Sequence, residues 1–138
     1  MLKPDSLSVR TNSKLPLELR SILLVEQDPE LRDSRRILLA SLQHPVLVVS
    51  AYAEACKLPP DSNCGLVVVD ISPNERDARR IAIYVRQTWP TAKILLLGCP
   101  SEEFDDPLYD DSVNAPYNPA GVVETAKRLL DNADYSLH

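Results

Sequence analysis

Short apolar runs alternate with amphipathic stretches along most of the chain. Four runs of four apolar residues lie at 22–25, 46–49, 66–69 and 94–97, each bounded by polar residues, proline or glycine. Runs of this length that are rich in Val, Ile and Leu predict strands, and their lack of alternation is typical of strands buried on both faces of a sheet. A fifth, weaker strand is predicted at 112–115.

The stretch after the first predicted strand carries the signals of a helix start. Asp28 can cap the helix, and Pro29 suits its first position. The pattern predicts an end near Gln43. The expected inner stripe consists of Leu31, Leu38 and Leu42, and the side chains expected to face water are Arg32, Arg35 and Arg36.

Three more helices are predicted further along the chain. They are a short helix at 52–58, an amphipathic helix at 74–89 and a last helix that begins after Asn118 and runs to about 131. Because strands and helices alternate throughout, we expect a parallel sheet with helices on both faces.

The two ends of the chain lack these patterns. We expect residues 1–20 to form a flexible N-terminal arm, residues 21–131 one domain and residues 132–138 a C-terminal tail. No apolar run approaches the ~20 residues needed to cross a bilayer, and the N-terminal residues carry no signal-peptide stretch. These features predict a cytoplasmic protein with no membrane partner.

Composition excludes several further classes of function. Fifteen basic and twenty acidic residues give a formal net charge of −5, which argues against direct nucleic-acid binding. The three cysteines are widely spaced, so neither a disulfide framework nor a zinc site is expected. No glycine belongs to a nucleotide-binding loop and no nucleophile elbow is present, so we do not expect a dinucleotide enzyme, an NTPase, a hydrolase or any other enzyme.

Acidic residues gather where a parallel sheet has its ligand site, at the carboxyl ends of the strands. Glu26 and Asp28 follow the first predicted strand, and Asp70 ends the third. Carboxylates at this edge can bind a divalent cation or attack phosphorus. Asp28 is explained as a helix cap, whereas Asp70 ends a wholly apolar strand where solvation is poor, which indicates a functional role.

The order of these segments resembles a response-regulator receiver domain over about residues 20–131. Residues 21–32 resemble its opening, and residues 66–72 resemble its phosphoacceptor strand. Residues 94–97 resemble its fourth strand, and Ala115-Pro116-Tyr117 stands where the family has Lys-Pro-Phe. The resemblance implies a flavodoxin-like three-layer sandwich whose five parallel strands have the order 2-1-3-4-5. It also implies two-component signalling, in which a histidine kinase transfers a phosphoryl group to one aspartate.

The resemblance assigns roles to residues at the predicted site. Asp70 corresponds to the phosphoacceptor, and Glu26, Asp70 and Ser72 correspond to magnesium ligands. Gln27 is neutral where the family usually has an acid, so we expect Mg²⁺ to bind only weakly.

At three positions of the family's phosphorylation switch, this chain lacks the type of side chain that the family usually has. Gly98 replaces a Ser or Thr, Ser112 replaces an aromatic residue and Ala115 replaces a Lys. The stretch between Gly98 and Ala115 is also several residues shorter than the family norm, so the fourth helix should be short or missing. These departures indicate an atypical receiver, or pseudo-receiver.

Two functions remain open at this point. The favoured one is an atypical receiver that acts mainly as a phosphorylation-independent protein-interaction module, and the alternative is a working receiver that takes phosphate from a histidine kinase on Asp70. A flavin carrier fits poorly, because residues 26–29 differ from the small residues of a flavin phosphate loop. The expected partner is a histidine kinase or another signalling protein. The basic helix 74–89 and the acidic stretch 102–111 would also allow a homodimer.

Overall fold

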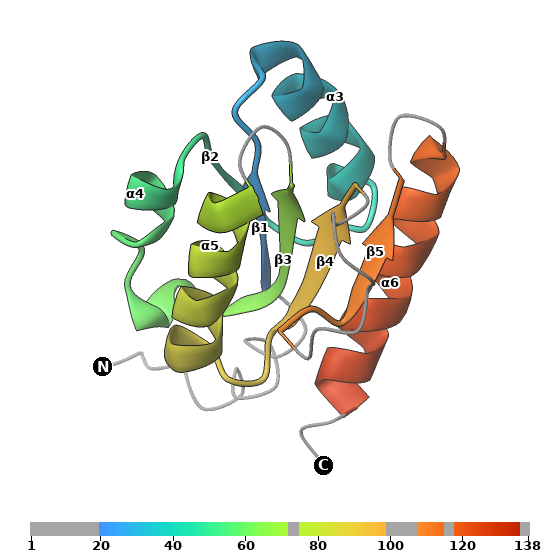
Figure 1. Ribbon diagram of the computed structural model, residues 1–138. Coiled ribbons are helices and arrows are strands. Elements are labelled where there is room, and N and C mark those ends of the chain that lie inside the picture. The colour runs from blue at the N-terminus through green and yellow to red at the C-terminus, as the bar shows by residue number, and fades with distance from the viewer. Residues whose placement is uncertain (1–19, 72–74, 99–107, 115–117, 136–138) are drawn as a thin grey trace, which may run out of the picture.

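The structure, a computed structural model, describes residues 20–71, 75–98, 108–114 and 118–135. Five parallel strands form a sheet in the order β2-β1-β3-β4-β5, as predicted (Figure 1). The strands are β1 (Ser21–Val25), β2 (Val46–Val49), β3 (Cys64–Asp70), β4 (Lys93–Leu97) and β5 (Asp111–Val113). The helices are α3 (Pro29–Ala40), α4 (Tyr52–Ala55), α5 (Glu75–Thr88) and α6 (Pro119–Tyr135), and a short 3-10 helix, η2 (Pro60–Ser62), precedes β3.

The sheet lies between two layers of helices. Helices α4 and α5 cover one face, and α3 and α6 cover the other (Figure 1). Successive side chains of a strand point to opposite faces, so each apolar run supplies both cores. In β3, for example, Val67 and Val69 pack toward α5, whereas Leu66 and Val68 pack toward α6. This double burial explains the uninterrupted apolar runs within β1, β3 and β4, whereas the edge strand β2 is half-buried throughout.

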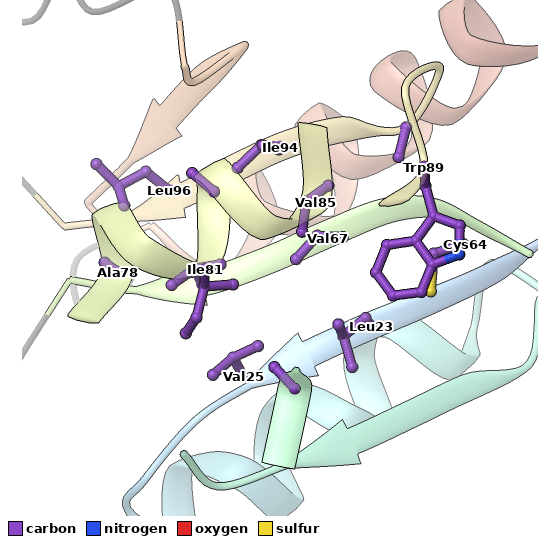
Figure 2. Close-up of a cluster of buried hydrophobic side chains, with 14 of the residues drawn as sticks. Leu23, Val25, Cys64, Val67, Ala78, Ile81, Val85, Trp89, Ile94 and Leu96 are labelled. Atoms are coloured by element: carbon purple, nitrogen blue, oxygen red, sulfur yellow. The ribbon is translucent and has the colours of Figure 1, made fainter. Parts of the chain in front are cut away.

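The core under α5 confirms the predicted inner face of that helix. Figure 2 shows Ala78, Ile81 and Val85 pointing toward the strands, and all three are buried. Trp89 closes this core at the end of the helix, where its indole Nε1 donates a hydrogen bond to the carbonyl of Pro60 at 2.9 Å. The register of α5 therefore follows directly from its apolar spacing.

The predicted faces of α3 are wrong in part. Arg35 and Leu39 are the buried residues of the helix, whereas Leu31 is 40% exposed. The observed inner stripe runs through Arg35, Leu39 and the half-buried Leu42, at the spacing i, i+4, i+7. The sequence-based prediction placed the charged residue outside because of its charge, but the phase of the helix brings Arg35 over the sheet.

Several predictions concern residues outside the described ranges. They include the N-terminal arm up to residue 19, the end of the C-terminal tail and the fourth helix, which would occupy part of 99–107. Residue 20, which we assigned to the arm, is described, and its arginine side chain is buried at the start of β1. Of the described helices, none is long and apolar enough to cross a membrane.

The cap of α3 leads to a first prediction. The Asp28 side chain accepts hydrogen bonds from the backbone N–H groups of Glu30 and Leu31, at 2.9 and 3.2 Å. Replacing the cap by Asp28→Ala should lower the free energy of unfolding by about 1 kcal/mol, because both N–H groups lose their partner. Urea unfolding measures the change, and Asp33→Ala, an exposed acid in the same helix, serves as the control. Equal stability of the two variants would contradict the capping role.

Candidate functional site

Two carboxylates meet at the carboxyl edge of the sheet because their strands are adjacent and in register. Val25 at the end of β1 pairs with Val69 of β3, so the next residues, Glu26 and Asp70, lie side by side. Glu26 is buried, and the Asp70 side chain is 11% exposed. This pairing brings together the two acids that the sequence placed at the same edge of the sheet.

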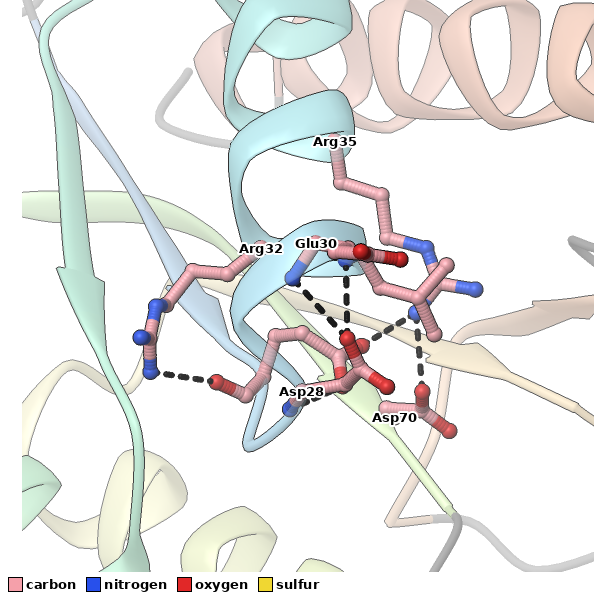
Figure 3. Close-up of polar contacts among 7 residues, drawn as sticks. Asp28, Glu30, Arg32, Arg35 and Asp70 are labelled. Atoms are coloured by element: carbon pink, nitrogen blue, oxygen red, sulfur yellow. Dashed lines mark hydrogen bonds and ion pairs between the residues drawn. The ribbon is translucent and has the colours of Figure 1, made fainter.

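An arginine from α3 lies between the two carboxylates. The Nη1 atom of Arg35 donates to Asp70 Oδ2 at 2.8 Å and makes a short ion pair with Glu26 Oε1 (Figure 3). The Arg35 side chain is only 7% exposed and that of Glu26 only 2%. A single guanidinium thus bridges the ends of β1 and β3 inside the protein.

Backbone contacts hold Glu26 in this position. The N–H of Asp28 donates to Glu26 Oε2 at 3.0 Å, and Arg32 Nη1 donates to the Glu26 carbonyl at 3.3 Å. Both carboxylate oxygens of Glu26 are therefore engaged, one by Arg35 and the other by the turn that starts α3. Arg32 and Asp28 act as positioning residues because they fix Glu26 rather than reach Asp70.

One guanidinium for two buried carboxylates leaves the site with an excess of negative charge. Burial, and next the hydrogen-bonded carboxyl of Asp70, raise the pKa of Glu26 from its usual 4.5 to about 7. The N–H of Asp28 and the charge of Arg35 act in the opposite direction. Glu26 therefore takes up a proton more readily than an exposed glutamate.

The residues in hand do not fit a magnesium site. Gln27 is exposed and neutral, and Ser72 lies outside the described residues. Within the described part of the chain, no group of three or more His, Cys, Asp or Glu residues could hold a metal ion. The two remaining ligands, Glu26 and Asp70, already hold the Arg35 guanidinium.

Two of the positions that the resemblance assigns to the family's switch, Gly98 and Ser112, lie within the described residues. Gly98 has a φ of +120°, and a Cβ atom built there would lie 2.3 Å from Cγ2 of Ile71. Ser112 is half-buried in β5, and its N–H donates to its neighbour Asp111 at 2.7 Å. Ala115 lies outside the described residues. The position of the family's switch hydroxyl is thus one that only glycine occupies without strain.

A cavity of about 150 Å³ borders the same edge of the sheet, on the side of α5. Asp70 lines it together with Gln27, so Asp70 can be reached from this side. Its lining residues are Val25, Gln27, Ser50, Ala51, Tyr52, Val69, Asp70, Asp77, Ala78 and Ile81.

Arg35 is the site residue that the sequence analysis missed. A signal was present, because the stripe through Leu39 and Leu42, extended back by one turn, falls on Arg35. The sequence-based prediction placed all three arginines of the helix on the water-facing side and therefore did not identify Arg35 as a site residue.

Comparison with known proteins identifies the fold. No protein-family model matches the chain, and no curated protein sequence matches it. Solved receiver domains do match it in structure. The chain has the fold of a response-regulator receiver domain.

The matching receivers cover most of the chain. The signal receiver domain of an HD-domain-containing protein from Pseudomonas fluorescens has a TM-score of 0.72 at 16% identity, covering 85% of this chain and 90% of its own. The response regulator TrrA from Thermotoga maritima, solved with Mg²⁺ and BeF, has a TM-score of 0.68 at 26% identity, with 80% and 98% covered.

A receiver from a kinase also matches. The receiver domain of the sensor histidine kinase PA1611 from Pseudomonas aeruginosa has a TM-score of 0.67 at 19% identity, with 81% of this chain and 98% of that chain covered. That structure holds a magnesium ion in its active-site cleft. Two of these matching structures therefore contain Mg²⁺, whereas here Arg35 lies between the two carboxylates at the carboxyl edge of the sheet.

The raised pKa of Glu26 leads to a second prediction. Between about pH 4.5 and 7 the folded protein holds a proton on Glu26 that the unfolded chain has released. The free energy of unfolding should therefore fall as the pH rises through this window, by at most about 3 kcal/mol. Urea unfolding at several pH values tests this, with Glu26→Gln, which mimics the protonated acid, as the matched variant. Parallel pH profiles of the two proteins would contradict the prediction.

The backbone at Gly98 leads to a third prediction. Gly98→Ser, which restores a hydroxyl at the switch position, should lower the free energy of unfolding by about 2 kcal/mol, because of the positive φ and the close Ile71 side chain. Gly98→Ala is the matched control and should cost a similar amount. If Gly98→Ser and Gly98→Ala both stay within about 0.5 kcal/mol of the wild type, the strain argument fails.

Proposed function

We propose that this chain is an atypical receiver in two-component, phosphorelay signalling that acts mainly as a protein-interaction module whose binding does not depend on phosphorylation. The observation that carries the proposal is the buried Arg35 guanidinium between Glu26 and Asp70. This ion pair supports a site whose carboxylates already have a cationic partner in the unphosphorylated protein, without a metal ion or a phosphoryl group.

The energetics of a buried ion pair favour this function. Removing one partner of such a pair costs about 3–5 kcal/mol, because the other charge is left buried and unpaired. Phosphorylation of Asp70 would convert the carboxylate that pairs with Arg35 into an acyl phosphate, so the ion pair would have to be rebuilt. The ion pair between Arg35 and Asp70 must therefore break before Asp70 can accept a phosphoryl group.

The switch positions support the same proposal. A modification shifts a conformational equilibrium only when it interacts differently with the two conformations. Gly98 has no side chain, and Ser112 is too small to act as the family's aromatic residue. The sequence places Ala115 at the family's lysine. A phosphoryl group on Asp70 would then have few contacts through which to move a distant surface.

The alternative is a working phosphoacceptor, and one observation favours it. Asp70 ends β3 and lines the cavity at the sheet edge, so a phosphodonor could reach it. Arg35 could then pair with the phosphoryl oxygens, a contact that guanidinium groups make well. Incubation with a small-molecule phosphodonor and magnesium, followed by intact mass, would detect the adduct on the wild type and not on Asp70→Asn.

The proposed partner is a histidine kinase or another signalling protein, because some receivers of this fold belong to sensor histidine kinases. A homodimer that pairs the basic helix α5 with the acidic stretch 102–111 of a second copy is the second arrangement we propose. Light scattering at low and high salt would separate a salt-sensitive dimer from a monomer.

A fourth prediction tests the proposed function itself. Any change that beryllofluoride with magnesium, a phosphoryl mimic, produces in the amide spectrum should stay near Asp70, for instance at Glu26 and Gln27, because no switch side chain transmits a change further. Paired amide correlation spectra with and without the mimic measure this, and Asp70→Asn is the control that shows which changes need the carboxylate. Shifts that spread through residues 99–117 in the wild type alone would show a working switch and overturn the interaction-module proposal.

A further inference from the structure

The buried cluster of Glu26, Arg35 and Asp70 carries an inference about which cation this site holds. We propose that Arg35 is a built-in counter-ion that takes the place of a divalent metal between the two carboxylates and thereby closes the site to Mg²⁺. The inference deepens the proposed function and rests on it, because it concerns the same site and explains why that site would not need metal.

The first argument is the position of the guanidinium. Arg35 Nη1 bonds to one oxygen of each carboxylate, Glu26 Oε1 and Asp70 Oδ2. A cation that bridged Glu26 and Asp70 would use oxygens at this same point. The second Glu26 oxygen accepts a hydrogen bond from the N–H of Asp28, so both Glu26 oxygens already have a partner while Arg35 is in place.

The second argument is the charge. A guanidinium stays protonated at every pH at which proteins fold, so Arg35 is a permanent positive charge in contact with both acids. A divalent ion that entered beside it would meet like charge at contact distance in a poorly solvated site. Metal binding therefore requires the guanidinium to leave.

The third argument is that Arg35 is held in place from both ends. Asp28 caps the start of α3, and Leu39, one turn after Arg35, is fully buried in the core, so the backbone that carries Arg35 is fixed. Among the described residues, the guanidinium bonds only to these two carboxylates. If it left, it would exchange two buried ion pairs for water, and both acids would lose the charge of the guanidinium.

This inference can be separated from a simpler explanation of weak metal binding. The neutral Gln27 removes one carboxylate from the site, and if the number of acids were limiting, Gln27→Asp alone would restore tight Mg²⁺ binding. If Arg35 is limiting, the added acid changes little, because Gln27 is exposed while the guanidinium still bridges Glu26 and Asp70.

The test is a calorimetric titration of Mg²⁺ into the full chain and its variants at constant ionic strength. Arg35→Gln should bind Mg²⁺ at least about tenfold more tightly than the wild type, since the competing cation is gone. Arg36→Gln, an exposed arginine next to it with the same change in charge, should bind as the wild type does, and so should Gln27→Asp. Equal affinity of Arg35→Gln and wild type would overturn the inference, as would tight binding by Gln27→Asp alone.

Thermal unfolding tests the same inference even if Arg35→Gln is less stable than the wild type. A ligand that binds only the folded state raises Tm, so Mg²⁺ should stabilise Arg35→Gln and leave the wild type and Arg36→Gln nearly unchanged. The same rise in all three proteins would contradict the inference.

The wild-type protein supplies a measurement that needs no variant to fold. Millimolar Mg²⁺ should leave the amide signals of Gln27 and Ile71 without a saturable shift, and a saturable shift there would overturn the inference. Such a result would still leave the interaction module standing, because that proposal fails only if the phosphoryl mimic produces changes far from Asp70.

Discussion

The ion pair of Arg35 with Glu26 and Asp70 is the contact on which the functional edge of the sheet depends. It connects α3 to the ends of two neighbouring strands, and all three side chains are largely buried. Buried charges persist in proteins only when they are paired and hydrogen-bonded. Each member of the cluster is therefore required by the other two, and the cap at Asp28 and the bond from Arg32 keep the geometry in place.

The same contact links the fold to the proposed function. A receiver site built for phosphoryl chemistry keeps its acids available for a metal ion, whereas here an arginine of the chain itself neutralises part of their charge. The position of Gly98 acts in the same direction, because its positive φ and the adjacent Ile71 leave no room for a switch hydroxyl. Under the proposed function, metal binding and signal transmission would thus be altered at separate points of one edge, as in a module that presents a constant surface to its partner.

A second polar cluster holds the opposite side of the sheet. Arg86 of α5 donates to the carbonyls of Ala92 and Leu108 and to Asp110, and Asp110 in turn accepts from the N–H of Ile94. These bonds tie the end of α5 to the entry of β5, a strand of only three residues. Together with the pairing of β5 with β4 and the ion pair of Arg128 with Asp111, this cluster fixes the edge strand to the rest of the sheet.

The apolar pattern by itself predicted a parallel sheet with helices on both faces, and the family resemblance added the order of the strands. Four strands and the phase of α5 could be predicted because burying apolar side chains dominates the free energy of folding and its periodicity is written in the sequence. The cap at Asp28 could be predicted because it depends on residues that are neighbours in the chain. Glu26 and Asp70 could be placed at one edge because parallel strands end together.

Only the tertiary structure decided what those acids contact. Arg35 is thirty-five residues from Asp70, and whether its side chain faces water or the site depends on the phase of α3 relative to the sheet. A charged residue is usually exposed, so the sequence-based prediction placed Arg35 on the water-facing side. Its burial is favourable only because two carboxylates from other segments of the chain pair with it. The backbone conformation of Gly98 could not be predicted for the same reason, because its φ and its distance to Ile71 depend on how β4 packs against β3. The apolar spacing of α3 indicates only the direction in which Arg35 points, whereas its pairing with Glu26 and Asp70 depends on long-range packing that the tertiary structure decides.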